Sequence, residues 1–238
     1  FIDGIGVSPF SLTVDPPAVA ACASAGSVAL DIDIGQAEPG FTGTVNLAAS
    51  GQPTGGTVAF VPPSVVTPGS SVLTVGSLGS ATPGNYTLVV TGTSGGDEVS
   101  RSVPFALNDV APGPAGLVSP ANNATNVIVQ PTLSWTAASS GGATSYLVEV
   151  ASDAGFSSIV FSQVVDDLTS VQVSPALASN TDYWWRVTSS NACGTAAASA
   201  VFRFTTQPAP GDCAPGATTV DVFTEDFSGG LGGFSTAG

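Results

Sequence analysis

The side chains that carry most enzyme chemistry are missing from this chain or scarce in it. The 238 residues include no histidine, 17 aspartate or glutamate residues and 3 cations, all of them arginine. Without histidine, neither a Ser–His–Asp nor a Cys–His arrangement can form, and without lysine, Schiff-base chemistry and Lys–Asn isopeptide crosslinks are excluded. Zinc sites built on histidine or on a CxxC pair are absent, as are Gly-rich phosphate loops. The sequence therefore predicts a protein that is not an enzyme and binds no cofactor.

Neighbouring carboxylates are the one catalytic class that the composition leaves open. A catalytic pair must converge in a cleft, whereas these residues fit solvated strand faces or turns better. Calcium binding is the milder alternative, although no DxDxDG loop is present. The pairs are Asp31 with Asp33, Asp97 with Glu98, and Asp166 with Asp167, and a further calcium candidate is Glu225 with Asp226.

Three cysteines are the remaining reactive groups, at Cys22, Cys193 and Cys213. Cys193 and Cys213 flank the strand that we expect to end the second domain, so we predict a disulfide between them in an oxidising compartment. Cys22 is then left over, and we expect it to be a small buried side chain. A bond from Cys22 to a neighbouring chain or to a segment outside this one is the alternative.

The charge balance limits the partners of the chain. Only 8% of the residues are charged, and the formal net charge is −14, so nucleic acid and anionic membrane surfaces would repel it. Its hydrophobic residues, 43% of the total, suffice for a packed core. No apolar run approaches the ~20 residues that a membrane-spanning helix needs. We expect a secreted or cell-surface location and no membrane insertion.

Short β-strands are the elements that must position these groups. The 29 glycines and 18 prolines argue against long helices, because proline removes a helix donor and glycine costs backbone entropy. Apolar residues alternate with others at a period of two, as in residues 28–34. Regular short strands separated by Gly and Pro turns predict an all-β protein made of sandwiches.

The turn signals divide the chain into two tandem sandwiches with short terminal strands. We expect an entry segment or strand at residues 1–8, a first sandwich at 9–110, a Pro-rich joint at 111–114, a second sandwich at 115–207, and, at 208–238, a linker with the first strand of a truncated jelly-roll-like domain.

Both sandwiches resemble known families. Residues 131–135, 145–150, 180–187 and 202–206 together resemble a fibronectin type III domain of the bacterial secreted kind. The first sandwich resembles bacterial Ig-like domains, and its matching pieces are residues 41–47, 58–60, 67–75 and 84–95.

Tandems of this kind occur in the C-terminal halves of large bacterial exoproteins, notably secreted metallopeptidases resembling reprolysin. The resemblance implies a non-catalytic accessory, spacing or adhesive region, whose partners are the other domains of the parent exoprotein.

A fibronectin-like sandwich would place two of the three arginines on one sheet face. The strands that hold Glu149, Arg186 and Arg203 lie side by side in such a fold, and alternation puts Leu147 and Trp184 on the same outer face. The structural explanation is a cross-strand salt bridge, with Trp184 covering aliphatic stems, worth ~0.5–1 kcal/mol. The alternative is an interaction patch, since Trp and Arg are favoured interface anchors.

Three functions fit these observations, and the first is favoured. It is a non-catalytic accessory or adhesive spacer of a secreted bacterial exoprotein. The second is a subunit of an extracellular filament, in which the strand-like residues 1–7 or 219–227 add to a sheet edge of an identical subunit. The third is a carbohydrate-binding module with Trp184 as its stacking platform.

Overall fold

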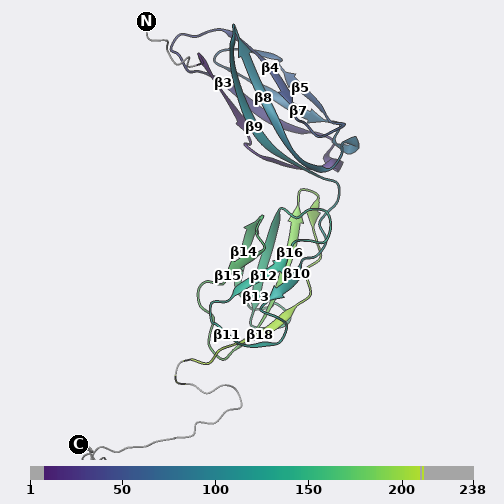
Figure 1. Cartoon of the computed structure of the whole chain (residues 1–238), viewed down its shortest axis with the longest axis vertical. Helices are drawn as coiled ribbons and strands as arrows, with labels where there is room; N and C mark the ends of the chain where they lie inside the picture. The colour runs from purple at the N-terminus through teal and green to yellow at the C-terminus, as the bar shows by residue number, and fades with distance from the viewer. Residues whose placement is uncertain (1–7, 210, 212–238) are drawn as a thin grey trace, which may run out of the picture.

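The computed structural model describes residues 8–209 and residue 211, and its regular structure is almost entirely β-strand. The strands form two sandwiches placed end to end (Figure 1). The all-β class predicted from the alternation is therefore confirmed. Within the described residues, no helix is long and apolar enough to cross a membrane.

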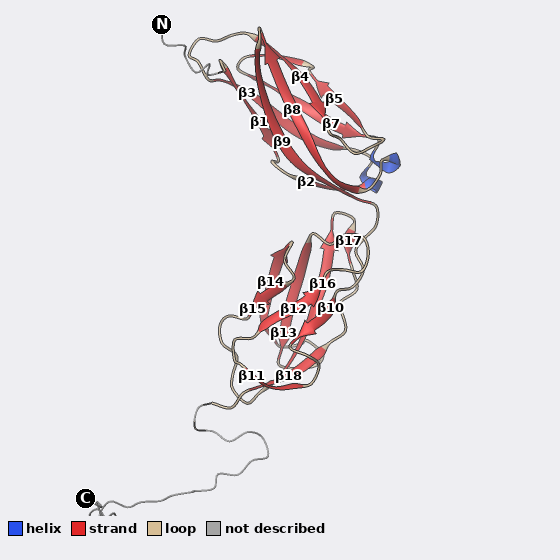
Figure 2. Cartoon of the chain, in the orientation of Figure 1, coloured by secondary structure: helices blue, strands red, loops and turns tan. Residues whose placement is uncertain are grey.

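The first sandwich holds two sheets with the strand orders β1-β3-β7-β5 and β2-β9-β8-β4-β6. Two short 3-10 helices, η1 and η2, lie at the end of this sandwich that faces the second one (Figure 2). The elements are β1 (Phe10–Asp15), β2 (Val19–Cys22), η1 (Ala23–Ala25), β3 (Val28–Gln36), β4 (Thr44–Ser50), β5 (Thr57–Val61), β6 (Ser64–Val66), β7 (Gly69–Gly76), η2 (Leu78–Ser80), β8 (Gly84–Ser94) and β9 (Asp97–Asn108).

The second sandwich holds sheets with the orders β10-β12-β15 and β11-β18-β16-β13-β14, and β17 pairs with β16. In the described residues, no strand of this sandwich pairs with a strand of the first. The elements are β10 (Gly116–Ser119), β11 (Ala124–Val127), β12 (Thr132–Thr136), β13 (Ser145–Ala151), β14 (Ile159–Asp166), β15 (Ser170–Gln172), β16 (Asp182–Asn191), β17 (Gly194–Thr195) and β18 (Phe202–Thr206).

Alternating side chains fill the space between the sheets of each sandwich. On β3, Leu30, Ile32 and Ile34 are buried, whereas the residues between them face solvent. Apolar residues from both sheets meet in one core per sandwich. In the second core, Trp185 is fully buried and packs edge-on against Phe202. Large rings suit this position because they span the ~10 Å between sheets.

Each sandwich has a tyrosine near the start of one central strand, bonded to the backbone a few residues upstream. The Tyr86 hydroxyl on β8 donates to the Thr82 carbonyl at 2.8 Å. The Tyr183 hydroxyl on β16 accepts from the Ala178 N–H at 3.1 Å. This corner is a hallmark of immunoglobulin-like sandwiches and identifies β8 and β16 as equivalent strands.

Candidate functional site

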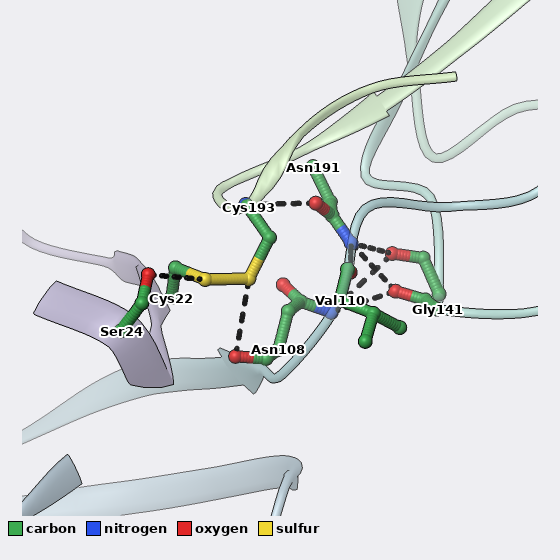
Figure 3. The surroundings of a disulfide bond; sticks show 8 residues. Cys22, Ser24, Asn108, Val110, Gly141, Asn191 and Cys193 are labelled. Atoms are coloured by element: carbon green, nitrogen blue, oxygen red, sulfur yellow. Dashed lines mark hydrogen bonds between the residues drawn. A yellow bond between two sulfur atoms is a disulfide. The ribbon is translucent and has the colours of Figure 1, made fainter. Parts of the chain in front are cut away.

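The joint between the two sandwiches is crosslinked by a disulfide between Cys22 and Cys193, which are 171 residues apart in the sequence (Figure 3). Cys22 ends β2 and lies opposite Asn108, the last residue of β9. Cys193 lies in the turn that joins β16 to β17. The Cα atoms of the two cysteines are 4.8 Å apart, within the range that a disulfide requires. The bond therefore joins the first sandwich to the second.

The predicted disulfide between Cys193 and Cys213 is wrong, because Cys193 is bonded to Cys22. Asp182 on β16 lies opposite Thr205 on β18, so the chain leaves β18 at the end of the sandwich that is remote from Cys193. The 10 residues of β16 span ~33 Å. The stretch from Thr206 to Cys213 reaches only ~25 Å. Cys213 itself lies outside the described residues.

The expectation that Cys22 is an unpaired buried side chain is also wrong. Sequence reasoning paired the two cysteines that are close in the sequence. The partner of Cys22 depends instead on how the two sandwiches are placed at the joint. The periodicity of the strands gives no information on that placement.

Two asparagine side chains beside the disulfide bind backbone carbonyls of the linker and of the loop between β12 and β13 (Figure 3). Nδ2 of Asn191 donates to the carbonyls of Val110 at 2.9 Å and Gly141 at 2.6 Å. Nδ2 of Asn108 also donates to the Gly141 carbonyl, at 3.0 Å. Oδ1 of Asn191 accepts the N–H of Cys193 at 2.8 Å, which holds the turn that presents the cysteine.

A buried hydroxyl attaches the Pro-rich segment to the second sandwich. Ser189 on β16 is fully buried, and its hydroxyl donates to the Gly113 carbonyl at 2.8 Å. The Gly113 N–H in turn donates to the Ser140 carbonyl at 3.0 Å. The connection is therefore bonded along its length to the domain that follows it.

On the sheet of the second sandwich that holds β13, β16 and β18, the charged side chains form two ion pairs. Glu149 and Arg186 lie directly opposite each other on β13 and β16, and Nε of Arg186 donates to Oε2 of Glu149 at 2.8 Å. The Arg186 guanidinium lies 4.0 Å from the ring centroid of Phe156, in the loop before β14. The backbone N–H groups of Ser157 and Ser158 in this loop donate to the Asp153 carboxylate and hold its pKa below the usual value.

Arg203 pairs with Asp182 at the far end of the same face. The Thr205 hydroxyl donates to Oδ1 of Asp182 at 2.6 Å, and this bond, followed by the bond from Arg203, lowers the pKa of Asp182. The Arg203 guanidinium lies 5.9 Å from the Trp184 ring. A hollow lined by Asn126, Asn180 and Pro208 adjoins this ion pair.

The sheet order places the five predicted patch residues on the neighbouring strands β13, β16 and β18: Leu147, Glu149, Trp184, Arg186 and Arg203. Both arginines of this sheet face are in ion pairs. Sequence reasoning missed two of the partners. Asp182 was detectable, because it alternates onto the same face as Trp184. Phe156 was not, because its loop has no periodic signal. An interaction role for this face stays a prediction.

Trp184 is half-buried, and no aromatic side chain in the described residues is fully exposed. A sugar-stacking platform needs an open ring face. The geometry therefore gives the carbohydrate-binding alternative no support.

The carboxylate pairs singled out in the sequence lie on an exposed strand face or at strand ends. Asp31 and Asp33 point to solvent from β3, Asp97 and Glu98 begin β9, and Asp166 ends β14. Asp167 follows in a turn and lines a groove between the two sandwiches. In residues 8–209, no three His, Cys, Asp or Glu side chains gather to hold a metal ion. Glu225 and Asp226 lie outside the described residues.

Comparisons with known proteins identify the domain type. A family model described as "Rha78A-like, N-terminal immunoglobulin domain" matches residues 121–208. No curated protein matches the chain. The chain therefore contains an Ig- or fibronectin type III-like module, whereas an association with reprolysin-like peptidases stays a prediction.

Solved structures similar to this chain include the fibronectin(III)-like modules of Clostridium thermocellum CbhA, with 12% identity over 85% of this chain and 97% of that one, and a TM-score of 0.41. The FN1–FN3 domains of chicken CNTN1 are 16% identical over 75% of this chain and 62% of theirs, with a TM-score of 0.34. Domains 4 and 5 of the S-layer protein SbsC are 21% identical over 41% of this chain and 50% of theirs, with a TM-score of 0.30. The match thus spans less than two thirds of the CNTN1 and SbsC chains.

Proposed function

We propose that this chain is a non-catalytic pair of Ig- and fibronectin type III-like domains that acts as a rigid accessory spacer in a secreted bacterial exoprotein. The observation that carries the proposal is the disulfide between Cys22 and Cys193. Domains joined by a short linker move relative to one another unless something fixes their interface. A covalent bond beside the linker supplies a second attachment point and restricts that motion.

The same bond supports a location outside the cytoplasm. Disulfides persist in oxidising compartments, while thiols in the cytosol are kept reduced. The resemblance to accessory modules of secreted metallopeptidases agrees with this location and supports a bacterial exoprotein as the parent. Two sandwiches end to end would separate its other parts by ~70 Å, taking ~36 Å for the 11 residues of β8.

Small-angle X-ray scattering tests the spacer. The Cys22→Ser/Cys193→Ser variant removes the crosslink, and Cys213→Ser is the matched control for the loss of a cysteine. We expect the wild type and Cys213→Ser to scatter as one elongated shape, and the double variant to show a broader range of dimensions. Superimposable curves for all three proteins would show that the disulfide does not set the domain angle.

An extracellular filament subunit is the second candidate, favoured by one edge strand of the second sandwich, β14, which is long, apolar and unprotected. Such an edge can accept a strand from another chain. Negative-stain microscopy should show fibres of the full chain, and deleting residues 1–8 or 219–238 should abolish them. Fibres that persist in both deletions would exclude assembly through terminal strands.

A further inference from the structure

β14 is longer than the other edge strands of the described sheets, and no proline flanks it directly. It has 8 residues, and the nearest following proline is Pro175. The other edges have 6 residues or fewer. Because proline cannot donate to a ladder, it blocks the addition of a strand. Prolines directly flank four of those edges: Pro9 and Pro16 at β1, Pro62 at β5, Pro63 at β6 and Pro120 at β10.

The side chains of β14 give it no protection by charge. Its single ionisable residue is Asp166, at the end of the strand. Ile159, Val160 and Val164 are exposed, and Val164 keeps 61% of its surface in solvent. A register shift at Val160 leaves Phe161 to Asp166 regularly paired with β13. Among the described residues, no strand pairs with the outer side of β14, so about six residues of this edge can form main-chain hydrogen bonds with an added strand.

The sheet surface beside this edge is apolar and locally neutral. Val164 lies opposite Leu147 on β13, and Ser162 lies opposite Glu149, whose carboxylate is paired with Arg186. Apart from Asp166 at the end of β14, this surface adds little repulsion to an approaching segment of a chain whose net charge is −14.

We propose that β14 accepts residues 1–7 of a second copy of this chain as an added strand. This inference rests on the proposed filament function and identifies the strand that accepts the terminal segment. Residues 1–7 (FIDGIGV) have four large apolar side chains and one charge, and their number matches the open edge. Residues 219–227 (TVDVFTEDF) carry three acidic residues, which Asp166 would repel, so charge selects the first segment.

The donor must come from another copy because its own segment cannot reach. Phe10, at the start of β1, pairs with Gln36, at the end of β3. β3 begins just after η1, which lies at the joint end of the first sandwich (Figure 2), so the end of β3 is remote from the joint. Seven residues extend at most ~25 Å, whereas the 11 residues of β8 alone run ~36 Å along the first sandwich. β14 lies beyond that length, in the second sandwich. The contact is therefore head to tail and, when repeated, produces an open fibre.

Val164→Lys tests the edge in the full chain, since a lysine at an exposed edge position opposes strand addition. Val66→Lys is the matched control, because Val66 lies on the edge strand β6 and is 62% exposed. We expect light scattering and microscopy to show fibres for the wild type and Val66→Lys, and a roughly tenfold or larger loss of polymer for Val164→Lys. Fibres of Val164→Lys equal to those of the wild type would overturn the proposal and leave the filament candidate standing.

A peptide experiment separates the acceptor edge from filament formation. A peptide with the sequence of residues 1–7 is added to the chain that lacks those residues, and hydrogen exchange is followed. We expect the amides of β14 to exchange roughly tenfold more slowly, and an Ile5→Pro peptide to have no effect. Protection of β14 in a chain that never forms fibres would support the edge and reject the filament. No protection by the peptide would reject the edge.

Discussion

The carboxylate of Asp182 binds two side chains of the neighbouring strand at once. Its Oδ1 accepts the Thr205 hydroxyl, and its Oδ2 pairs with Arg203. Both partners favour the charged form, and therefore the pKa of Asp182 is lowered from the ordinary 3.8. Because folding lowers this pKa, the stabilisation is fully present above the ordinary value and is lost as pH falls through the folded-state value.

Asp182→Asn should therefore destabilise the protein near neutral pH only. We expect a loss of less than ~1 kcal/mol in the free energy of unfolding, because the side chain is 37% exposed and solvent screens the pair. The difference from the wild type should shrink as the wild-type carboxyl protonates. Urea unfolding across the acid range measures it, with Asp97→Asn at the exposed start of β9 as the control. A difference that persists in strong acid would mean that shape, not charge, makes Asp182 important.

At the scale of elements, the joint depends on one loop that approaches the linker closely. Gly141 has a φ of +71°, and a Cβ there would lie 2.6 Å from the Ala111 carbonyl oxygen. Its own carbonyl accepts from both Asn108 and Asn191. A side chain at this position would push the linker away from the loop that anchors it.

Gly141→Ala can be compared with Gly95→Ala to isolate that contact. Gly95 has a similar φ of +68°, but a Cβ there would meet nothing within 4 Å. Both variants bear the cost of a positive φ, roughly 1 kcal/mol. We expect Gly141→Ala to lose about 1–2 kcal/mol more in chemical unfolding, as overpacking does elsewhere. Equal losses in the free energy of unfolding would show that the linker can shift away from the added methyl group without destabilising the protein.

The strands were predictable because each carries its own evidence. On β3 and β16, alternation marks the buried side from the residues alone, and it correctly placed Leu30, Ile32, Tyr183 and Trp185 inside. The joint was not predictable in this way. Whether Cys193 meets Cys22 depends on the angle between two sandwiches, and that angle leaves no periodic trace in either strand. Phe156 was missed for a related reason, since a loop bonded around Asp153 has no pattern to read.

For the whole molecule, the disulfide couples the stability of the two sandwiches. The loop that it closes contains most of both domains, because Cys22 lies near the start of the first and Cys193 near the end of the second. Crosslinking so long a loop removes entropy from the unfolded chain, which stabilises the folded protein by about 5 kcal/mol in the chain-entropy model.

Calorimetry of the Cys22→Ser/Cys193→Ser variant should reveal this coupling. We expect both domains to unfold at lower temperature than in the wild type, because each loses a constraint on its unfolded state. Cys213→Ser should unfold as the wild type does. A shift confined to one domain would show that the bond stabilises a local contact and not the loop as a whole.

The placement of this bond also determines how the chain would respond to pulling. A load applied at Ser8 and Thr206 enters β1 and β2, crosses from Cys22 to Cys193, and leaves through β17 and β18. The intervening stretch, with a sequence separation of 171, lies outside this path and bears no tension while the bond is intact. Even after both sandwiches lost their structure, only the short flanking segments could lengthen. The oxidised chain is a tether of nearly fixed length, and its reduced form is one that stretches several-fold further.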